Sequence, residues 1–343
     1  MSAASRPRLE QLDIGSGSAQ RGPLNAITDV PGVAVGHTTV RSETLSTGVT
    51  AIVPRQLDAS RRSLPAGLAV GNGYGKLIGA TQLRELGMIE TPVLLTSTLS
   101  AFRVADALVA YMLEQPGHER TTTLNPIVGE TNDGYLSDIR SRPVGETAVR
   151  AALAAAASGP VEEGGVGAGT GTVTMGYKGG IGTASRVVAV GAHQYTFGVL
   201  VQSNYSGTLR IDGVPMPAEE LLMEDPAVSP GNSCMIVIAT DAPLDARQLG
   251  RVANRAIFAL RSTGSDFAQG SDDYAIAFSV GDDRAPDDEL LSPAFLAVME
   301  ATEEALINSV LRAETRHGFE GRVARGVPID RVRERLARRG GAA

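Results

Sequence analysis

With 343 residues, the chain can bury a large hydrophobic core, either as one large domain or as two ordinary ones. Its net charge of −7 argues against a nucleic-acid-binding surface, and no apolar run is long enough to span a membrane or to form a secretory signal, so we expect a cytoplasmic protein. A single cysteine cannot form an internal disulfide or a cysteine-rich zinc site, and the four histidines do not stand at a metal-ligand spacing, so we expect neither a metal nor a cofactor.

The first half of the chain is predicted to alternate between strands and helices. Residues 1–25 are mostly polar, and we expect them to form a loose N-terminal arm. We predict strands at residues 27–35, 48–53, 68–71, 92–96 and 126–128, and helices at residues 77–86, 100–114 and 146–157.

The second half is richer in β-structure. Glycine-containing turns separate the β-prone runs that begin at residue 170, which indicates antiparallel pairing. We predict strands at residues 170–175, 185–190, 195–203, 233–240 and 274–280, and helices at residues 217–223, 245–260 and 293–311. Strand pairs mixed with helix pairs favour an α+β fold in which helices cover the sheets.

The dipeptide Asn232-Ser233 stands at the start of the apolar run that ends at Thr240. A loop that contains Pro226, Pro230 and Gly231 leads directly into it. The simplest interpretation is a turn followed by a core strand. If the bond before Ser233 were cut, however, that residue would carry a hydroxyl nucleophile and an N-terminal amine together, a pairing that nucleophilic catalysis uses.

Three further segments place polar groups densely between apolar runs, at residues 130–138, 202–207 and 270–274. The first is equally consistent with a structural loop that contains Asx turns. An amide in the second could donate to an oxyanion. In the third, Ser271 and Asp273 share one face of a strand while Asp272 points to the other, so we expect that pair, and not Asp272, to approach a common point. Together with Ser233 these segments contain the groups needed for acyl transfer.

A glycine-rich segment at residues 71–76 precedes a predicted helix. Its backbone N–H groups could receive an anion or a substrate carbonyl at the helix N-terminus. A tight strand-to-helix turn is the alternative interpretation.

Several of these segments, read together, resemble one known family. Residues 132–140, 178–186, 201–205 and 231–244 are similar to the motifs of the L-aminopeptidase/D-amino-acid esterase family, the DmpA-like group of peptidase family S58 that includes the β-peptidyl aminopeptidases. The likeness follows the chain in order from about residue 27 to beyond residue 280, so it covers nearly the whole sequence.

The resemblance implies a single catalytic domain over residues 1–343, with the αββα four-layer sandwich that resembles Ntn hydrolases but differs in connectivity. It also implies an inactive precursor that cleaves itself before a Ser or Thr. The cut between Asn232 and Ser233 would give an α chain of residues 1–232 and a β chain of residues 233–343. Related members assemble as tetramers of such αβ heterodimers, and they act on small peptide, amide or ester substrates.

The resemblance also assigns roles to individual residues. Asp273 stands where β-peptidyl relatives usually have Glu, which is longer by one methylene. The expected site consists of the nucleophile Ser233, the residues Tyr135 and Asn204 around the reacting carbonyl, the pair Ser271 and Asp273 beside the nucleophile, and Glu130 and Asn132 as substrate-binding residues.

In the expected mechanism, the Ser233 hydroxyl attacks the Asn232 carbonyl, and water then hydrolyses the resulting ester. The freed α-amine has an ordinary pKa of about 7.7–8.0, so either this amine or Asp273 acting through Ser271 could accept the hydroxyl proton during catalysis. Three alternatives remain at this point: an amidase of ω-amino-acid oligomers, an ornithine acetyltransferase, and a non-enzymatic binding protein on the same fold. The preferences for α- or β-amino acids and for L- or D-stereochemistry stay open, because the shape of the pocket decides them.

Overall fold

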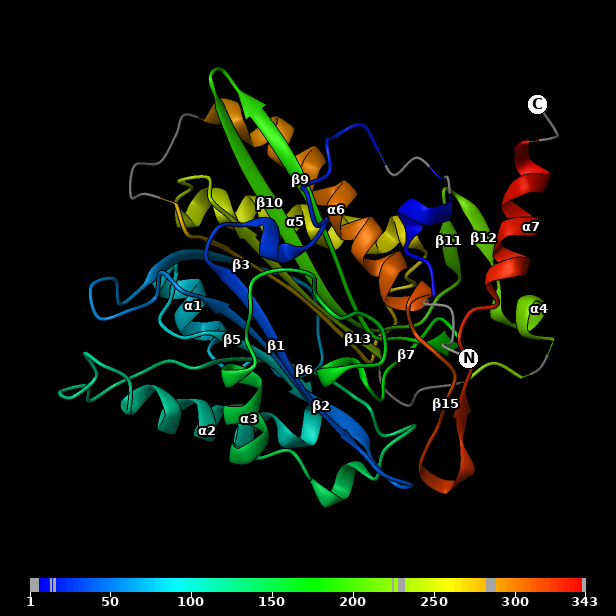
Figure 1. Cartoon of the computed structure of the whole chain (residues 1–343), viewed down its shortest axis with the longest axis horizontal. Coiled ribbons are helices and arrows are strands. Elements are labelled where there is room, and N and C mark those ends of the chain that lie inside the picture. The colour runs from blue at the N-terminus through cyan, green and yellow to red at the C-terminus, as the bar shows by residue number, and fades with distance from the viewer. Residues whose placement is uncertain are drawn as a thin grey trace.

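Two β-sheets form the centre of the molecule, which is described here by a computed structural model covering residues 6–12, 14, 17–223, 225–227, 232–281 and 288–340 (Figure 1). The larger sheet is built from β3 (Leu64–Gly73), β4 (Met88–Ile89), β9 (Ile181–Val190), β10 (His193–Asn204), β13 (Asn232–Thr240) and β14 (Ser271–Ser279), in the spatial order β4-β3-β14-β13-β10-β9. The smaller sheet is built from β1 (Val33–Arg41), β2 (Ser46–Pro54), β5 (Val93–Ser97) and β6 (Ile127–Thr131), in the order β1-β2-β5-β6.

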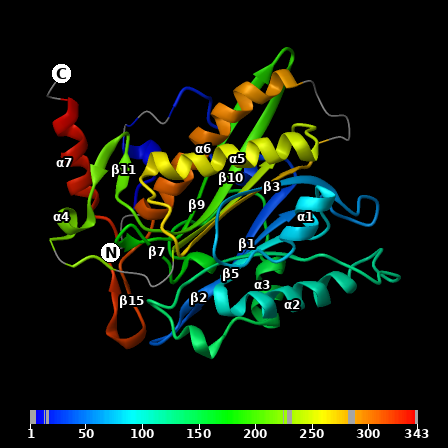
Figure 2. The same ribbon diagram turned by 180° about the vertical axis from the view of Figure 1, so that it is seen from behind.

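Four helices cover the outer faces of the two sheets. They are α2 (Ala101–Leu113), α3 (Glu146–Ala154), α5 (Ala246–Thr263) and α6 (Leu291–Leu311). Helices α5 and α6 pack on the larger sheet, and α2 and α3 pack on the smaller one, which Figures 1 and 2 show from opposite sides. The layers therefore run helix, sheet, sheet, helix. This confirms the expected α+β class and its αββα arrangement.

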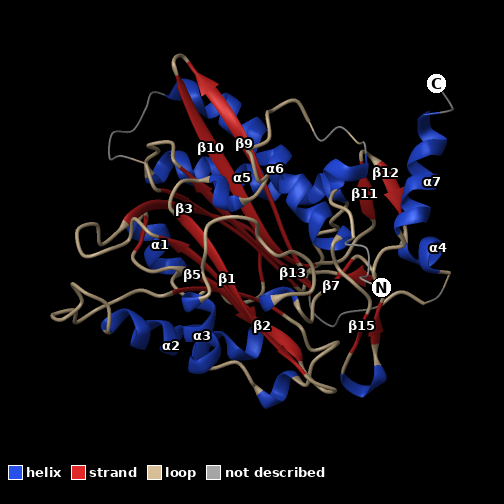
Figure 3. Cartoon of the chain, viewed as in Figure 1, coloured by secondary structure: helices blue, strands red, loops and turns tan. Residues whose placement is uncertain are grey.

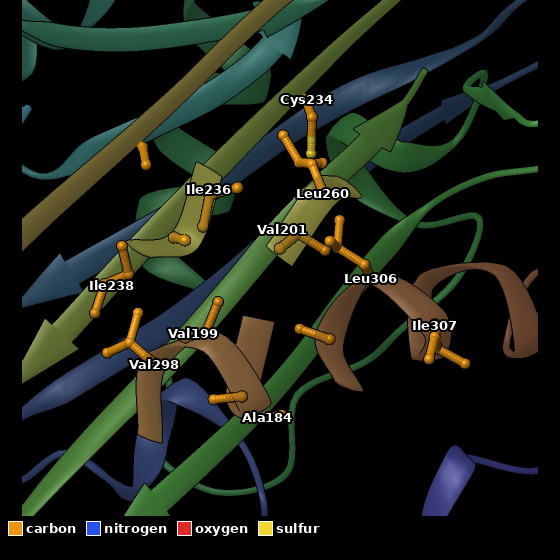
Figure 4. Packing of buried hydrophobic residues seen from close by; sticks show 14 of the residues in the cluster. Ala184, Val199, Val201, Cys234, Ile236, Ile238, Leu260, Val298, Leu306 and Ile307 are labelled. Atoms are coloured by element: carbon orange, nitrogen blue, oxygen red, sulfur yellow. The ribbon is translucent and has the colours of Figure 1, made fainter. Parts of the chain in front are cut away.

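Both faces of strand β13 are buried. Cys234, Ile236 and Ile238 point into the core between the larger sheet and its helices, where Leu260 and Leu306 meet them (Figure 4). Met235, Val237 and Ala239 belong to the second core, between the two sheets. A strand buried on both sides reads as a continuous apolar run rather than an alternating one, which is the pattern of this segment.

Helix α5 begins and ends at residues that favour those positions. The Asp245 side chain accepts a hydrogen bond from the Gln248 N–H at 2.7 Å and so caps the first turn. Gly264, with φ of 108°, ends the helix in the left-handed conformation that glycine adopts most easily.

Figure 3 shows the remaining helices and strands together with these layers. The helices are α1 (Ala80–Leu86), α4 (Ala218–Leu222) and α7 (Ile329–Gly340), and the strands are β7 (Val173–Thr174), β8 (Tyr177–Lys178), β11 (Leu209–Ile211), β12 (Val214–Met216), β15 (Arg316–His317) and β16 (Val323–Ala324). The 3₁₀ turns are Leu9–Leu12, Ile27–Asp29, Thr98–Ser100, Ile139–Ser141, Gly167–Gly169, Asp288–Leu290 and Phe319–Gly321. No helix among the described residues combines the length and the apolar character that a membrane crossing needs.

Three sequence-based expectations differ from the structure. Of the strand predicted at residues 170–175, only Val173–Thr174 is observed, as β7, because a 3₁₀ turn at Gly167–Gly169 leads into this segment. The strand predicted at residues 27–35 begins as a 3₁₀ turn, because Pro31 and Gly32 (φ of 79°) form a turn before β1 starts at Val33. The N-terminal arm, in its described residues, is packed rather than loose. Leu9 is buried, and the Arg8 guanidinium donates to the Thr183 carbonyl at 2.8 Å and pairs with Glu163 at 2.9 Å. Burial of an apolar side chain and ion pairing together hold this segment against β9.

Candidate active site

Ser233 lies at the buried start of β13, between two neighbouring strands. It is opposite Asn204 in the antiparallel pairing with β10 and opposite Asp272 in the parallel pairing with β14. Residues directly opposite one another in a sheet share a face. The side chains of all three residues therefore point toward the smaller sheet, on the same side as Met235 and Val237.

Asp272 is the carboxylate directly opposite the candidate nucleophile in the pairing of β13 with β14. Only 4% of Asp272 is exposed. Burial raises the pKa of Asp272 to about 8, and the nearby charge of Glu130 acts in the same direction, while Ser233 and Lys76 oppose the shift. The sequence-based expectation that Asp272 would point away from the common site was wrong. Which side chain of β14 lies beside Ser233 depends on the register between β13 and β14. The periodicity within a single strand does not specify that register.

Ser271 and Asp273 do form a pair, as predicted. The Ser271 hydroxyl donates to Asp273 Oδ2 at 2.8 Å, and both residues are fully buried. The pair lies on the opposite face of β14 from Asp272, so it faces the helices together with Cys234, and Ser271 is opposite Asn232 rather than Ser233. Burial raises the pKa of Asp273 to about 6. The pair therefore adjoins the Asn232 side of the candidate bond and not the Ser233 side chain.

Two amides of β10 have different partners. Asn204 Oδ1 accepts a hydrogen bond from the Val173 N–H at 3.0 Å, which fixes the orientation of this buried amide beside Ser233. Gln202 Nε2 instead donates to the Thr96 carbonyl at 3.1 Å and to Thr131 Oγ1 at 2.8 Å, both on the smaller sheet. The Gln202 side chain therefore links the two sheets through hydrogen bonds. Asn204 is the amide that lies next to the nucleophile.

Glu130 is a second carboxylate whose charge acts on Asp272. Its carboxylate is buried and accepts hydrogen bonds from the backbone N–H of Lys76 at 3.0 Å and from Lys76 Nζ at 3.1 Å. Lys76 Nζ also donates to Thr98 Oγ1 at 2.8 Å. The segment 71–76 therefore does receive an anion through a backbone N–H, as the sequence suggested, but the anion is a side chain of the protein itself.

Asn132 and Tyr135 each form a hydrogen bond to a backbone group of the protein. Asn132 Oδ1 accepts a hydrogen bond from the Gly134 N–H at 2.9 Å, the Asx turn that was the alternative interpretation of this loop. The Tyr135 hydroxyl donates to the Val323 carbonyl at 3.4 Å, and the Arg322 guanidinium lies 5.7 Å from the centre of its ring. The expected roles of both residues toward substrate stay predictions.

A pocket of about 260 Å³ adjoins the candidate bond, with Asn232, Val173, Tyr205 and Ala227 in its wall. A larger cavity, of about 470 Å³, lies away from Ser233, against the start of β5 and the end of α2. Pro226 is in the wall of the smaller pocket, whereas Pro230 and Gly231 of the same loop lie outside the described residues. Within the described ranges, no three His, Cys, Asp or Glu side chains gather as a metal site requires.

A comparison with known protein families shows to which family the chain belongs. The model of peptidase family S58 matches residues 25–324. The chain belongs to peptidase family S58. This membership confirms the family expected from the sequence and the expected enzyme class, a serine-type aminopeptidase.

Curated relatives and solved structures agree with the assignment. The chain is 38% identical to β-peptidyl aminopeptidase BapA of Sphingosinicella xenopeptidilytica, over 91% of this chain and 86% of that one, and 36% identical to BapA of Sphingosinicella microcystinivorans, over 96% and 92%. A β-aminopeptidase structure from a Burkholderia species matches with a TM-score of 0.91 at 38% identity, covering 97% of this chain and 99% of that chain. The L-aminopeptidase D-Ala-esterase/amidase of Ochrobactrum anthropi, described as a variant of the Ntn hydrolase fold, matches with a TM-score of 0.90 at 34% identity, covering 98% and 99%.

Proposed function

We propose that this chain is a self-processing aminopeptidase that cuts its own Asn232–Ser233 bond and then uses Ser233 as an N-terminal nucleophile. The observation that carries the proposal is the placement of Ser233 at the start of β13, with Asn204 and Asp272 on either side. A hydroxyl nucleophile, an amide donor and a neighbouring carboxylate are the groups that acyl transfer needs.

Self-cleavage would proceed through an ester. The Ser233 oxygen attacks the Asn232 carbonyl carbon, the bond to the Ser233 nitrogen breaks, and the acyl group moves from nitrogen to oxygen. Water then hydrolyses the ester and frees both the hydroxyl and the α-amine. The products would be an α chain of residues 1–232 and a β chain of residues 233–343, held together by the shared sheet, in which β10 pairs with β13 and β3 pairs with β14.

In the processed enzyme, the same serine would attack the amide or ester bond that follows an N-terminal amino acid of the substrate. The amide of Asn204, assisted by Tyr135, would stabilise the tetrahedral oxyanion. Glu130 would hold the ammonium group of the substrate, with Asn132 nearby, and the Ser271–Asp273 pair would act on the new α-amine from the Asn232 side. Water would then release the acyl-enzyme.

The names of the relatives bear on the substrates. Both curated relatives are β-peptidyl aminopeptidases, and one matching structure is a β-aminopeptidase, whereas another is an L-aminopeptidase with D-Ala-esterase and amidase activity. We therefore propose short β-amino-acid peptides and amides as the first substrates to test, followed by L-aminoacyl amides and D-amino-acid esters. We further propose that the αβ units assemble as tetramers.

The direct test is a denaturing gel of the purified protein, together with N-terminal sequencing of the smaller fragment. We expect two fragments, the smaller one beginning at Ser233. The substitution Ser233→Ala should leave one full-length chain and reduce turnover on the order of 10⁶-fold, as removal of a serine nucleophile does elsewhere. The matched control Ser60→Ala, on an exposed loop, should behave as the wild type.

Two outcomes would contradict this proposal. Active wild-type enzyme that runs as a single full-length band would disprove self-processing. Cleavage that persists in Ser233→Ala would show that a different protease cuts the chain.

A further inference from the structure

We propose that a second pocket, lined by segments far apart in the chain, binds a small oxyanion that carries two negative charges. This inference goes beyond the proposed aminopeptidase function. The pocket has a volume of about 300 Å³. Three cations would bind the anion: Arg41 at the end of β1, Lys178 at the end of β8 and Arg316 at the start of β15. No residue of the candidate active site is among the described residues of its wall.

Lys178 is a buried cation in the wall of this pocket. Only 1% of it is exposed, and its Nζ donates to the Gly169 carbonyl at 2.9 Å and to the Gly179 carbonyl at 2.6 Å. An ammonium group has three N–H donors, so these carbonyls leave a third donor for a ligand. Both partners are uncharged, whereas a buried charge is usually paired with an opposite one. An anion in the pocket would supply that opposite charge.

Arg41 reaches the same part of the pocket as Lys178. A Cβ atom added at Gly165 would lie 3.8 Å from Arg41 Nη2 and 3.8 Å from Lys178 Nζ, so both cationic groups lie close to a single point. Arg41 Nη2 also donates to the Gly165 carbonyl, which holds the guanidinium in this position. Because glycine has no side chain, residue 165 leaves the space between the two cations open, where one oxyanion could accept from both.

Arg316, the third cation, is held against the start of β2. Its Nε donates to Ser46 Oγ at 2.8 Å, and its Nη2 donates to the Leu45 carbonyl at 3.2 Å. Burial and the charge of Arg41 lower the pKa of Arg316. Burial, followed by the charges of both arginines, lowers the pKa of Lys178 to about 7. The three cations therefore repel one another, and a bound anion would relieve that repulsion.

The other charged groups around the pocket do not neutralise these three cations. Glu163 already pairs with Arg8 at 2.9 Å, and Glu162 and Glu314 are exposed to solvent. Asp133, which is outside the wall, raises the pKa of Lys178 but has a smaller effect than either arginine. The remaining charged residues of the wall are Arg6, Arg312, Glu162, Glu163 and Glu314. Cations therefore outnumber carboxylates in the wall.

The chemistry of the three cations selects the ligand. Guanidinium and ammonium donors bind the oxygens of sulfate, phosphate and carboxylate groups through charge-assisted hydrogen bonds. Arg41 and Lys178 precede residue 233 in the sequence, whereas Arg316 follows it. An anion bound by all three would therefore join two parts of the chain that the proposed cleavage would separate, and would stabilise their association.

The test is a calorimetric titration of the Ser233→Ala variant with sodium sulfate and with sodium succinate, against sodium chloride of matched ionic strength. This variant is a single full-length chain, so the result does not depend on whether the wild type cleaves itself. A pH of about 6.5, below the pKa of Lys178, keeps the lysine charged. We expect at least one of the two anions to bind with a Kd of about 1 mM or tighter. The tighter one shows whether the site prefers a tetrahedral oxyanion or a dicarboxylate.

Arg41→Gln, added to Ser233→Ala, should weaken binding at least about 10-fold, because a charge-assisted hydrogen bond is lost. Arg41 is exposed, so this substitution leaves the core intact. Lys178→Met, which removes the buried charge and keeps an unbranched side chain, should have the same effect. The matched control is Arg55→Gln. Arg55 is also exposed and donates to a backbone carbonyl, that of Ala156 at 3.3 Å, and this variant should bind as its parent does.

Thermal unfolding separates anion binding from a merely structural role of Arg41. Saturating anion should raise the Tm of the parent and of Arg55→Gln by about 2–4 °C and should not raise that of Arg41→Gln. An arginine needed only for its bond to Gly165 would instead lower the Tm equally in chloride and in the anion. The inference is overturned if neither anion binds the parent with a Kd of about 1 mM or tighter, or if Arg41→Gln keeps the binding and the gain in Tm of its parent.

Discussion

Asn204, the last residue of β10, lies directly opposite Ser233 across the antiparallel pairing of β10 with β13. Its amide oxygen is held by the Val173 N–H at 3.0 Å, so the side chain is fixed beside the nucleophile. A donor that is already oriented stabilises a developing oxyanion without any cost of reorganisation during the reaction.

Replacing Asn204 by Ala should lower kcat about 10²–10³-fold with little change in KM, and should slow self-cleavage by a similar factor, because both steps pass through an oxyanion. Steady-state kinetics and the gel assay of self-cleavage measure the two effects. The control is Asn308→Ala, which removes a buried amide that accepts the Leu9 N–H at 2.8 Å, away from the site. That variant should lose stability and keep its kcat. Wild-type kcat in Asn204→Ala would remove this residue from the oxyanion site.

Glu130→Gln should raise KM for substrates with a free amine about 10–100-fold, because a hydrogen bond to a charged group is lost. The kcat for saturating substrate should change less. Glu146→Gln is the matched control, since Glu146 pairs with Arg150 at 2.8 Å on the exposed face of α3. If KM is unchanged in Glu130→Gln, the ammonium group is bound by another residue.

Asp273 should make stability depend on pH. Its pKa rises from an ordinary 3.8 to about 6 in the folded protein, chiefly through burial, so folding favours the protonated form. This contribution is fully present below the ordinary pKa and is lost as pH rises through about 6. An asparagine at this position cannot ionise, so the variant does not lose this contribution as pH rises. The difference in unfolding free energy between Asp273→Asn and the unsubstituted chain should therefore shift in favour of the variant by up to about 3 kcal/mol from acidic to mildly alkaline pH.

This measurement is best made in the Ser233→Ala background, where a single uncut chain unfolds. Urea unfolding at about pH 4 and about pH 8 gives the two free energies. Asp330→Asn, an exposed acid on α7, is the control and should show no such difference. A difference between Asp273→Asn and its parent that does not vary with pH would mean that Asp273 ionises freely in the folded state.

Gly67 of β3 packs against Gly250 of α5, and only the position of Gly67 lacks space for a side chain. A Cβ atom at Gly67 would lie 2.1 Å from the Gly250 nitrogen, whereas a Cβ atom at Gly250 would meet nothing within 4 Å. Gly67→Ala should therefore destabilise the protein by about 1–3 kcal/mol or more through overpacking. Gly250→Ala should stabilise it by about 0.5–1 kcal/mol, because alanine is preferred inside a helix. Thermal unfolding of the two variants distinguishes them, and equal effects would contradict this description of the interface.

Local patterns in the sequence were sufficient to predict most long elements. The apolar spacing of residues 245–260 predicted the helix observed as α5, and the run from Ser233 to Thr240 predicted β13, because each signal depends on periodicity within one segment. The antiparallel pairing of β9 with β10 also followed from the glycine-containing turn between them. The start of β1 was missed because a proline–glycine turn interrupts an otherwise β-prone run.

The sequence by itself determined the family, the candidate nucleophile Ser233 and the fact that Ser271 and Asp273 share a face, since strand periodicity is a local property. Only the tertiary structure decided which face of β14 meets Ser233. That choice depends on how β14 aligns with β13, and a shift of one residue in that alignment exchanges Asp272 for Asp273 beside the nucleophile. The alignment is set by the packing of both strands against two cores, between residues that are far apart in the chain.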